Sequence, residues 1–465
     1  MRLPGLADPE AWPETTSSVV EAALNQVGDT RYLRIGSGAL SEVGTLVSHC
    51  FGERQAIVVV ADDNTFAAAG RSVDELLRAA GRIVAEPIVL PGNPPLYADQ
   101  RQLLGLGRAL SPLDVVPVVV GSGTLNDLTK LAAHRLGRPY LCIATAASMD
   151  GYASFGAIIT EEGFKRTIGC PAPRAVLADL DVLARAPVEL NAAGFGDLLG
   201  KVTAGADWIL ADALEIEPII GPAWSLVQDH LRGWIARPDR LRLSDPQAIE
   251  VLFQGLSAAG IAMQLSSSSR PASGSEHRFS HLWEMQALSK GEAPVLHGFK
   301  VGVGSIAAAA LYELLLARDL TRLDIAAACR SWPSRVEVER SVRQAHEDPR
   351  ISEHAVAESL AKHIDADSLE RRLYLLRKRW PEVRERLQAQ LLTARELREL
   401  LRQAGCPTHP SEIGVGPQQF RESHHLARTI RSRYTVLDLA AEIGLLNEFI
   451  GELFDAGGFW HSGNR

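Results

Sequence analysis

The chain has 465 residues, 46% of them hydrophobic, and carries a formal net charge of −8. A chain of this length can bury two or three hydrophobic cores, and its acidic balance excludes a general nucleic-acid binder, whose footprint would be basic. Five scattered cysteines without a CxxC pair are typical of a reduced protein and exclude a disulfide scaffold.

The first residues contain acids and prolines but no apolar core segment, so we expect no signal peptide. We also find no uninterrupted apolar run of membrane-spanning length. These two observations predict a soluble, cytoplasmic protein that has no membrane partner.

After a lead-in with a short helix around residues 19–26, the chain alternates short runs rich in Val or Ile with segments of helical spacing. The predicted strands are residues 32–35, 56–61, 87–90, 115–120 and 140–144, with a last strand region at 175–183. The predicted helices between them are residues 65–80, 97–109 and 126–136. This alternation predicts an α/β domain with a mostly parallel, Rossmann-like sheet that binds ligands beyond the carboxyl ends of its strands.

The strand at 115–120 is followed by a turn of small residues, namely Gly121, Ser122, Gly123, Thr124 and Leu125. Glycines between a strand and a helix allow backbone amides to approach a phosphate, and the helix dipole favours its negative charge. The pattern matches neither GxGxxG nor a Walker loop. A plain tight turn explains it equally well.

The strand at 140–144 is followed by a second stretch of small and hydroxylated residues, comprising Thr145, Ala146, Ala147, Ser148, Asp150 and Ser154. Such residues suit the wall of a nucleotide site, and the carboxylate of Asp150 can bind the hydroxyl groups of a polyol. The alternative is that Asp150 only caps a turn, which is a common role for Asp.

We place a domain boundary near residue 185, so that residues 1–185 form the α/β domain and residues 186–465 an all-helical domain. Near the start of the helical domain, Asp197 lies in a run of small and apolar residues. Asp is seldom buried unless it is paired or bound to a metal. An ion pair with Lys201, one turn further on, is the alternative.

Histidines mark the next distinctive stretch. Ser273 or Ser275 is placed to cap a helix that begins near Glu276, and His277 and His281 lie four residues apart on that helix, on one face. His297 opens the following helix. From spacing alone, a metal site and a structural role are about equally good explanations of these histidines.

Candidates for binding a phosphate are Arg270 with Ser273 and Ser275, and otherwise Lys165, Arg166 or Lys300. For each one, a solvated surface charge is the alternative. Further along, residues 369–378 and 385–403 are rich in Leu, Arg and Glu at helical spacing, and Pro381 and Gly405 punctuate them. We expect additional helices here, serving a homodimer interface.

Four blocks, GSGTLNDLTKLAAHRLGRPYLCIATAASMDGYAS, GFGDLLGK, GSEHRFSHLWEM and HGFKVGVG, occur in this order. Together they resemble the bacterial sn-glycerol-1-phosphate dehydrogenases, within the wider group of glycerol dehydrogenases, iron-type alcohol dehydrogenases and dehydroquinate synthases. The later PTHPSEIGVGPQQF and RYTVLDLAAEIGLL resemble the tails of bacterial members.

The resemblance implies NAD(P)H-dependent, metal-dependent reduction of dihydroxyacetone phosphate to sn-glycerol 1-phosphate, a small phosphorylated three-carbon compound. It implies that Asp197, His277 and His297 hold one divalent ion, zinc or nickel, and that Asp150 and His281 contact substrate. It also implies an NAD or NADP site lined by Gly121, Ser122, Gly123, Thr124, Leu125, Thr145, Ala146, Ala147, Ser148 and Ser154.

Three alternative functions remain: a carbocycle-forming lyase like dehydroquinate synthase, a dehydrogenase of another phosphorylated or free polyol, and a non-catalytic interaction protein. The lyase is disfavoured because an RGI sequence after the glycine turn and a Ser-Ser-Val-Gly-Gly-Lys block are missing. For the cofactor, Asp62 and Asp63 after the strand at 56–61 favour NADH, because carboxylates repel a 2′-phosphate.

Overall fold

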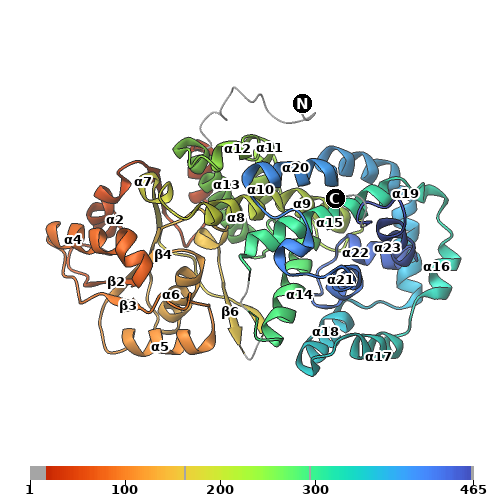
Figure 1. The fold of residues 1–465 in the computed structure, drawn as a ribbon, viewed down its shortest axis with the longest axis horizontal. Helices are drawn as coiled ribbons and strands as arrows, with labels where there is room; N and C mark the ends of the chain where they lie inside the picture. The colour runs from red at the N-terminus through yellow and green to blue at the C-terminus, as the bar shows by residue number, and fades with distance from the viewer. Residues whose placement is uncertain (1–16, 162–163, 293–294, 462–465) are drawn as a thin grey trace. The chain divides into compact units, whose positions relative to one another are not determined.

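A computed structural model describes residues 17–161, 164–292 and 295–461 (Figure 1). By packing, the chain divides into a first unit of Met1–Leu198, Pro222–Ser269 and Gln403–Gly405, and a second unit of Leu199–Gly221, Arg270–Arg402 and Cys406–Arg465. This division differs from a single boundary near residue 185, because residues 222–269 pack with the first unit. The domain boundary near residue 185, between an α/β domain and an all-helical domain, stays a prediction.

The first unit is built on a six-stranded sheet in which every pairing is parallel, as predicted. The order across the sheet is β1 (Tyr32–Gly36), β8 (Ala175–Asp179), β5 (Leu141–Ala144), β4 (Val116–Gly121), β2 (Ile57–Asp62) and β3 (Ile88–Leu90). All six predicted strand regions are therefore present. The parallel α/β fold with a helical C-terminal region is confirmed.

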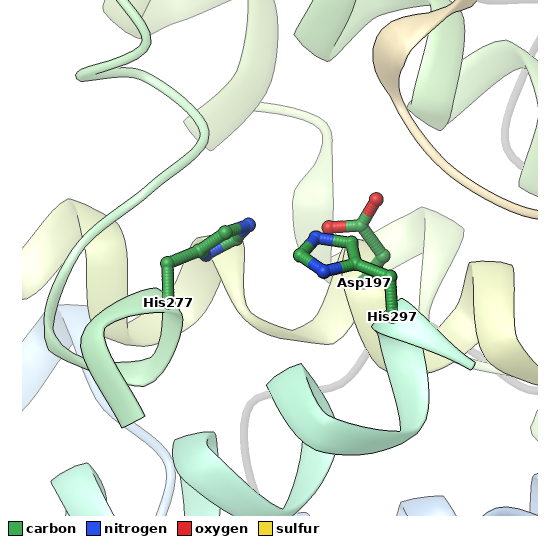
Figure 2. Close-up of side chains that lie close together, drawn as sticks. All are labelled: Asp197, His277 and His297. Carbon is green, nitrogen blue, oxygen red and sulfur yellow. The ribbon is translucent and has the colours of Figure 1, made fainter. Parts of the chain in front are cut away.

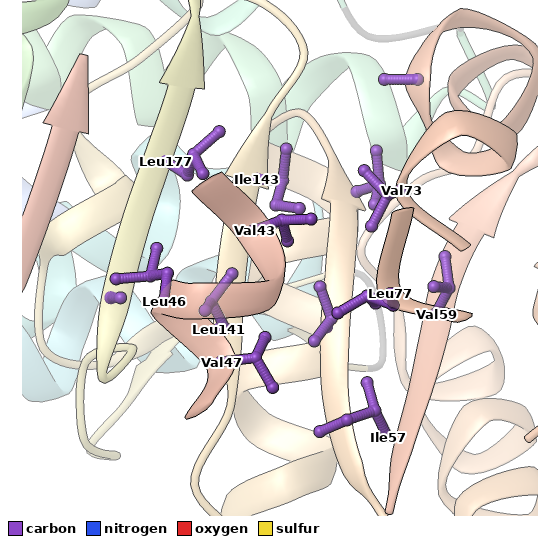
Figure 3. Close-up of a cluster of buried hydrophobic side chains, with 14 of the residues drawn as sticks. Val43, Leu46, Val47, Ile57, Val59, Val73, Leu77, Leu141, Ile143 and Leu177 are labelled. Carbon is purple, nitrogen blue, oxygen red and sulfur yellow. The ribbon is translucent and has the colours of Figure 1, made fainter. Parts of the chain in front are cut away.

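Helices cover both faces of this sheet because its strands are apolar on both sides. Ile57 and Val59 of β2 pack in one core with α2 (Val43–Phe51) and α4 (Arg71–Ala79), as Figure 3 shows. Val58 and Val60 point the other way, into a core with α5 (Gln100–Leu110) and α6 (Gly123–Arg135). The alternation follows from the two-residue period of a strand.

The carboxyl edge of the sheet brings the two predicted cofactor loops together. Gly121 at the end of β4 is paired with Ala144 at the end of β5, so the residues that follow each strand start side by side. The chain also runs from β3 to β4 across β2, which makes the carboxyl ends of β2 and β4 the point where the strand order reverses. Open α/β sheets bind ligands at such points.

Two local features of this unit were not predicted. The strands β6 (Ala157–Glu161) and β7 (Phe164–Ile168) pair in an antiparallel two-stranded sheet. The last strand also stops at Asp179 instead of continuing to residue 183, because the Asp179 side chain accepts a hydrogen bond from the backbone of Asp181 and caps α7 (Leu180–Leu183).

Two long helices of the described chain are strongly apolar. By length and composition α13 (Pro246–Ser266) and α15 (His297–Leu316) could each cross a membrane, but 72% and 78% of their most apolar windows are buried inside the protein. Such burial is typical of core helices. Each helix carries charged residues, such as Glu250 and Lys300, so neither is an uninterrupted apolar run.

The second unit is helical throughout its described part, and its C-terminal helices correct one expectation. The predicted helices at 369–378 and 385–403 are in fact α19 (Ala366–Gln390) and α20 (Ala394–Ala404), and α19 runs through Pro381. Pro in a helix interior removes a hydrogen bond. The buried row Leu369, Leu373, Leu376, Trp380, Val383 and Leu387 offsets that loss, which the sequence reading underestimated.

A glycine on α8 (Val188–Leu199) allows this helix to pack against the loop after β5. A Cβ at Gly194 would lie 1.8 Å from the carbonyl oxygen of Ala147, so Gly194→Ala has to displace that loop. We expect it to destabilise the protein by about 2 kcal/mol or more, as measured by urea unfolding.

Gly105→Ala on α5 is the matched control, because a Cβ there meets no atom within 4 Å. It should stabilise the protein by up to about 1 kcal/mol through the helix propensity of Ala. Equal effects of the two substitutions would contradict this account of the packing.

Candidate metal centre and cofactor loops

The start of α14 (Ser275–Ser289) is capped by buried carboxylates and not by a serine hydroxyl. Its N-cap residue is Gly274, which makes no side-chain cap. The Ser275 backbone N–H donates to Oδ2 of Asp207 at 2.6 Å, and the Gly274 N–H donates to Oε1 of Glu276 at 2.6 Å. The prediction of a Ser273 or Ser275 cap was therefore wrong, because charged acceptors satisfy the helix start more strongly.

Close packing of α14 against α15 brings the three predicted histidines together. A Cβ at Gly304 of α15 would lie 2.5 Å from the Glu276 carbonyl oxygen, so glycine is needed for this approach. The ring centroid of His277 lies 5.2 Å from that of His297 and 6.0 Å from that of His281. The His281 ring lies 6.1 Å from that of His297.

Asp197 is fully buried on α8, two residues before Leu199, where the second unit begins. Its Oδ2 accepts a hydrogen bond from the backbone N–H of Asp150 at 2.9 Å. One ligand atom each from Asp197, His277 and His297 lie within 4.8 Å of one another, and Figure 2 shows these side chains. Zinc binds N and O ligands at about 2.0–2.2 Å, so ligand atoms this close together make a candidate site for a single cation.

The imidazole of His277 is oriented by its neighbour in the chain. Oε1 of Glu276 lies 2.8 Å from Nδ1 of His277, and Oε2 accepts from the Thr203 hydroxyl at 2.7 Å. Burial raises the pKa of Glu276, but the hydrogen bond and charge of His277 and the bond from Thr203 outweigh it, so the pKa is lowered overall. A carboxylate on Nδ1 leaves Nε2 as the metal-binding atom, as is usual in metal sites, so the donor set fits a divalent cation.

Asp207 is a second buried carboxylate that anchors the helix start. Besides Ser275, it accepts from the Tyr312 hydroxyl and the Val436 backbone N–H, each at 2.7 Å. Burial, together with the charge of Glu276, raises the pKa of Asp207 to about 6. Sequence reasoning missed the roles of Asp207 and Glu276. Asp207 is an acid within an apolar stretch, and Glu276 is next to the candidate ligand His277.

The predicted cofactor loops of the first unit are held by backbone and side-chain contacts. Gly123 begins α6, and a Cβ there would lie 2.7 Å from the Met149 side chain. The Thr145 N–H donates to the Gly121 carbonyl at 3.2 Å, and the Ala147 N–H donates to Oδ1 of Asn191 at 2.9 Å. The predicted cofactor residues on the two loops therefore lie close together.

Ser148 and Ser154 have internal contacts of their own. The Ser148 hydroxyl lies 3.0 Å from that of Tyr152, and the Ser154 hydroxyl donates to the Gly151 carbonyl at 3.0 Å. The buried ammonium of Lys130 donates to the carbonyls of Gly151 and Ser154 at 3.1 and 2.9 Å. Lys130, which sequence reasoning did not identify, thus fastens the loop that carries Asp150.

The residues considered for phosphate binding have other roles in the structure. Arg270 is 1% exposed and donates to the backbone carbonyls of Tyr434 and Asp207, and Lys300 forms a buried ion pair with Glu284 at 2.7 Å. These two are neither solvated charges nor open anion receptors. Arg166 is exposed, and the Lys165 side chain lies outside the described residues.

Comparison with known proteins shows which families this sequence and fold are similar to. Residues 34–187 match the family model for iron-containing alcohol dehydrogenase. The fold is that of a probable glycerol dehydrogenase from Sinorhizobium meliloti, with a TM-score of 0.56 and 14% identity over 92% of this chain and 99% of that one.

The sequence relatives are more specific. A glycerol-1-phosphate dehydrogenase [NAD(P)+] of Geobacillus stearothermophilus is 32% identical over 88% of this chain and 92% of its own length. One from Halalkalibacterium halodurans is 39% identical over 55% of this chain and 65% of its own length. The chain belongs to the glycerol-1-phosphate dehydrogenase family.

The contact between Glu276 and His277 predicts an effect on metal affinity. Glu276→Gln keeps the size of the side chain but removes the charge that holds Nδ1 of His277. We expect divalent-cation affinity, measured by competition with a chromogenic chelator, to fall 10–100-fold. Glu189→Gln, a change of an exposed residue near the start of α8, is the control and should leave the divalent-cation affinity unchanged. Unaltered affinity in a folded Glu276→Gln protein would contradict this role.

Proposed function

We propose that this protein catalyses the reversible, NAD(P)H-dependent reduction of dihydroxyacetone phosphate to sn-glycerol 1-phosphate. The observation that supports it most directly is the gathering of ligand atoms from Asp197, His277 and His297 within 4.8 Å in a chain whose full-length relative bears that activity in its name. The substrate is a small phosphorylated three-carbon ketone.

Asp197, His277 and His297 would hold the cation, which would be zinc or nickel. When bound, the cation supplies Lewis acidity at the ketone oxygen and the nicotinamide supplies the hydride. Asp197 contributes charge and is oriented by the Asp150 N–H. His277 contributes a neutral imidazole whose tautomer Glu276 sets.

The carboxyl edge of the sheet would hold the dinucleotide. Backbone amides at the start of α6 would bind its pyrophosphate, favoured by the helix dipole. The residues that line this cofactor are Gly121, Ser122, Gly123, Thr124, Leu125, Thr145, Ala146, Ala147, Ser148 and Ser154. Asp62 and Asp63 at the end of β2 favour NADH, although each already accepts a backbone N–H, from Thr65 at 2.7 Å and from Gly92 at 3.1 Å.

Asp150 and His281 contact the substrate. His281 is 5% exposed and its ring lies next to those of both metal-binding histidines, which suits a group that delivers a proton to the substrate oxygen. The Asp150 carboxylate binds a substrate hydroxyl. We also propose that the protein works in the cytoplasm as a homodimer, with the C-terminal helices at the dimer interface.

A coupled assay tests the activity. NADH oxidation should require dihydroxyacetone phosphate, be abolished by a chelator and return on adding zinc or nickel. The product should resist oxidation by an enzyme specific for sn-glycerol 3-phosphate, because the two phosphates are enantiomers. Metal-loaded protein that oxidises no NADH with this ketone would contradict the proposal. A lyase of the dehydroquinate synthase type regenerates its NAD+ and consumes no NADH overall.

The role of His281 has its own test. His281→Gln should lower kcat at least about 100-fold, the range general acid catalysis contributes, while the bound metal per chain stays the same. His134→Gln, an exposed change on α6, should leave kcat unaltered. Full turnover by the His281→Gln enzyme across the pH range would exclude this side chain as the proton donor.

A further inference from the structure

A cavity lies wholly within the second unit. It has a volume of about 620 Å³ and is lined by α20, α21 (Pro417–Thr429), α23 (Leu446–Phe454) and the segments 409–415 and 459–461. Phe420, Phe454, Phe459 and Trp460 form much of its wall. This size falls in the range of small-molecule sites, and none of the candidate metal ligands lines it.

Arg398 of α20 is the distinctive group of this cavity. Its guanidinium carbon lies 4.3 Å from the ring centroid of Phe459 and 5.1 Å from that of Trp460. Stacking of this kind fixes the plane of the guanidinium and leaves its N–H edge for acceptors in that plane. Within the described residues Arg398 makes no ion pair or hydrogen bond, and its Nε is buried without a partner.

The other charged groups of the cavity are already engaged. Arg421 forms an ion pair with Asp455 at 3.2 Å, and Glu422 accepts from the Gln418 amide at 2.9 Å. Arg398 is half-buried among aromatic rings. The charges of Glu412 and Arg395 act on it without a direct ion pair.

Trp460 supplies a second donor. It is 8% exposed, and its Nε1 is buried and without a hydrogen-bond partner in the described part of the chain. Its backbone N–H donates to the Leu453 carbonyl at 2.8 Å, so this wall is fixed. An unsatisfied buried N–H destabilises the folded protein, and a ligand acceptor would offset that cost.

We propose that this cavity is a binding site for a small aromatic anion, a ring that bears a carboxylate or a phosphate. The anionic group binds the open edge of Arg398, and the ring packs on the aromatic wall. The inner wall also touches α14, because the ring centroid of Phe420 lies 6.1 Å from that of Trp283. The Phe420 ring therefore lies between the cavity and the helix that carries His277 and His281.

Fluorinated probes test the site by 19F NMR titration of the full-length, metal-loaded protein. We expect 4-fluorophenyl phosphate or 4-fluorobenzoate to bind, which separates the two anion classes, and neutral 4-fluorobenzyl alcohol to bind at least about 10-fold more weakly. Arg398→Gln should weaken the anion at least 10-fold, and Trp460→Phe, which keeps a ring but removes the N–H, should weaken it less. Arg402→Gln is the matched control, since Arg402 lies one turn on and is paired with Glu399.

Each contrary outcome overturns the assignment. Equal binding to Arg398→Gln and to Arg402→Gln would place the probe elsewhere, and displacement by saturating sn-glycerol 1-phosphate would place it in the substrate site. Equal affinity for the neutral analogue would remove the anion-binding role. These readouts do not depend on turnover, so they stand apart from the proposed dehydrogenase activity.

Discussion

The hydrogen bond between Glu276 and His277 is the constraint on which the candidate metal centre depends. It connects two residues adjacent in sequence, yet it exists because Thr203 and the Gly274 N–H hold the carboxylate in place from other sides. Asp207 fixes the same helix start through Ser275, Tyr312 and Val436. Buried carboxylates are costly unless every lone pair is used, so these contacts determine the position of the imidazole together with that of the helix.

The sheet sets the position of the cofactor loops by a different principle. Parallel pairing puts the ends of β4 and β5 in register at Gly121 and Ala144, and the reversal of strand order at β2 and β4 locates the ligand edge. Lys130 then ties the following loop to α6 through the carbonyls of Gly151 and Ser154. The hydrogen bonds from this buried ammonium order a loop that carries little apolar surface of its own.

The C-terminal helices contribute both to the network around Asp207 and to the aromatic cavity. They supply Val436 to the Asp207 network and Asp438 to a buried ion pair with Arg278 at 2.8 Å. They also enclose the aromatic cavity around Arg398. The same segment therefore stabilises the start of the histidine helix and forms a separate candidate binding site.

The sequence by itself determined the strands, the parallel sheet and the family, because short runs rich in Val or Ile and motif blocks are local signals. It also named Asp197, His277 and His297, although only the resemblance distinguished His277 from His281, one turn away. Tertiary structure alone decided the pairing of β6 with β7, the uninterrupted α19, and the roles of Glu276, Asp207, Lys130 and Arg270. Each of these features depends on contacts with residues distant in the chain or on burial in the folded protein. The type of a residue alone does not predict which distant residue it will contact.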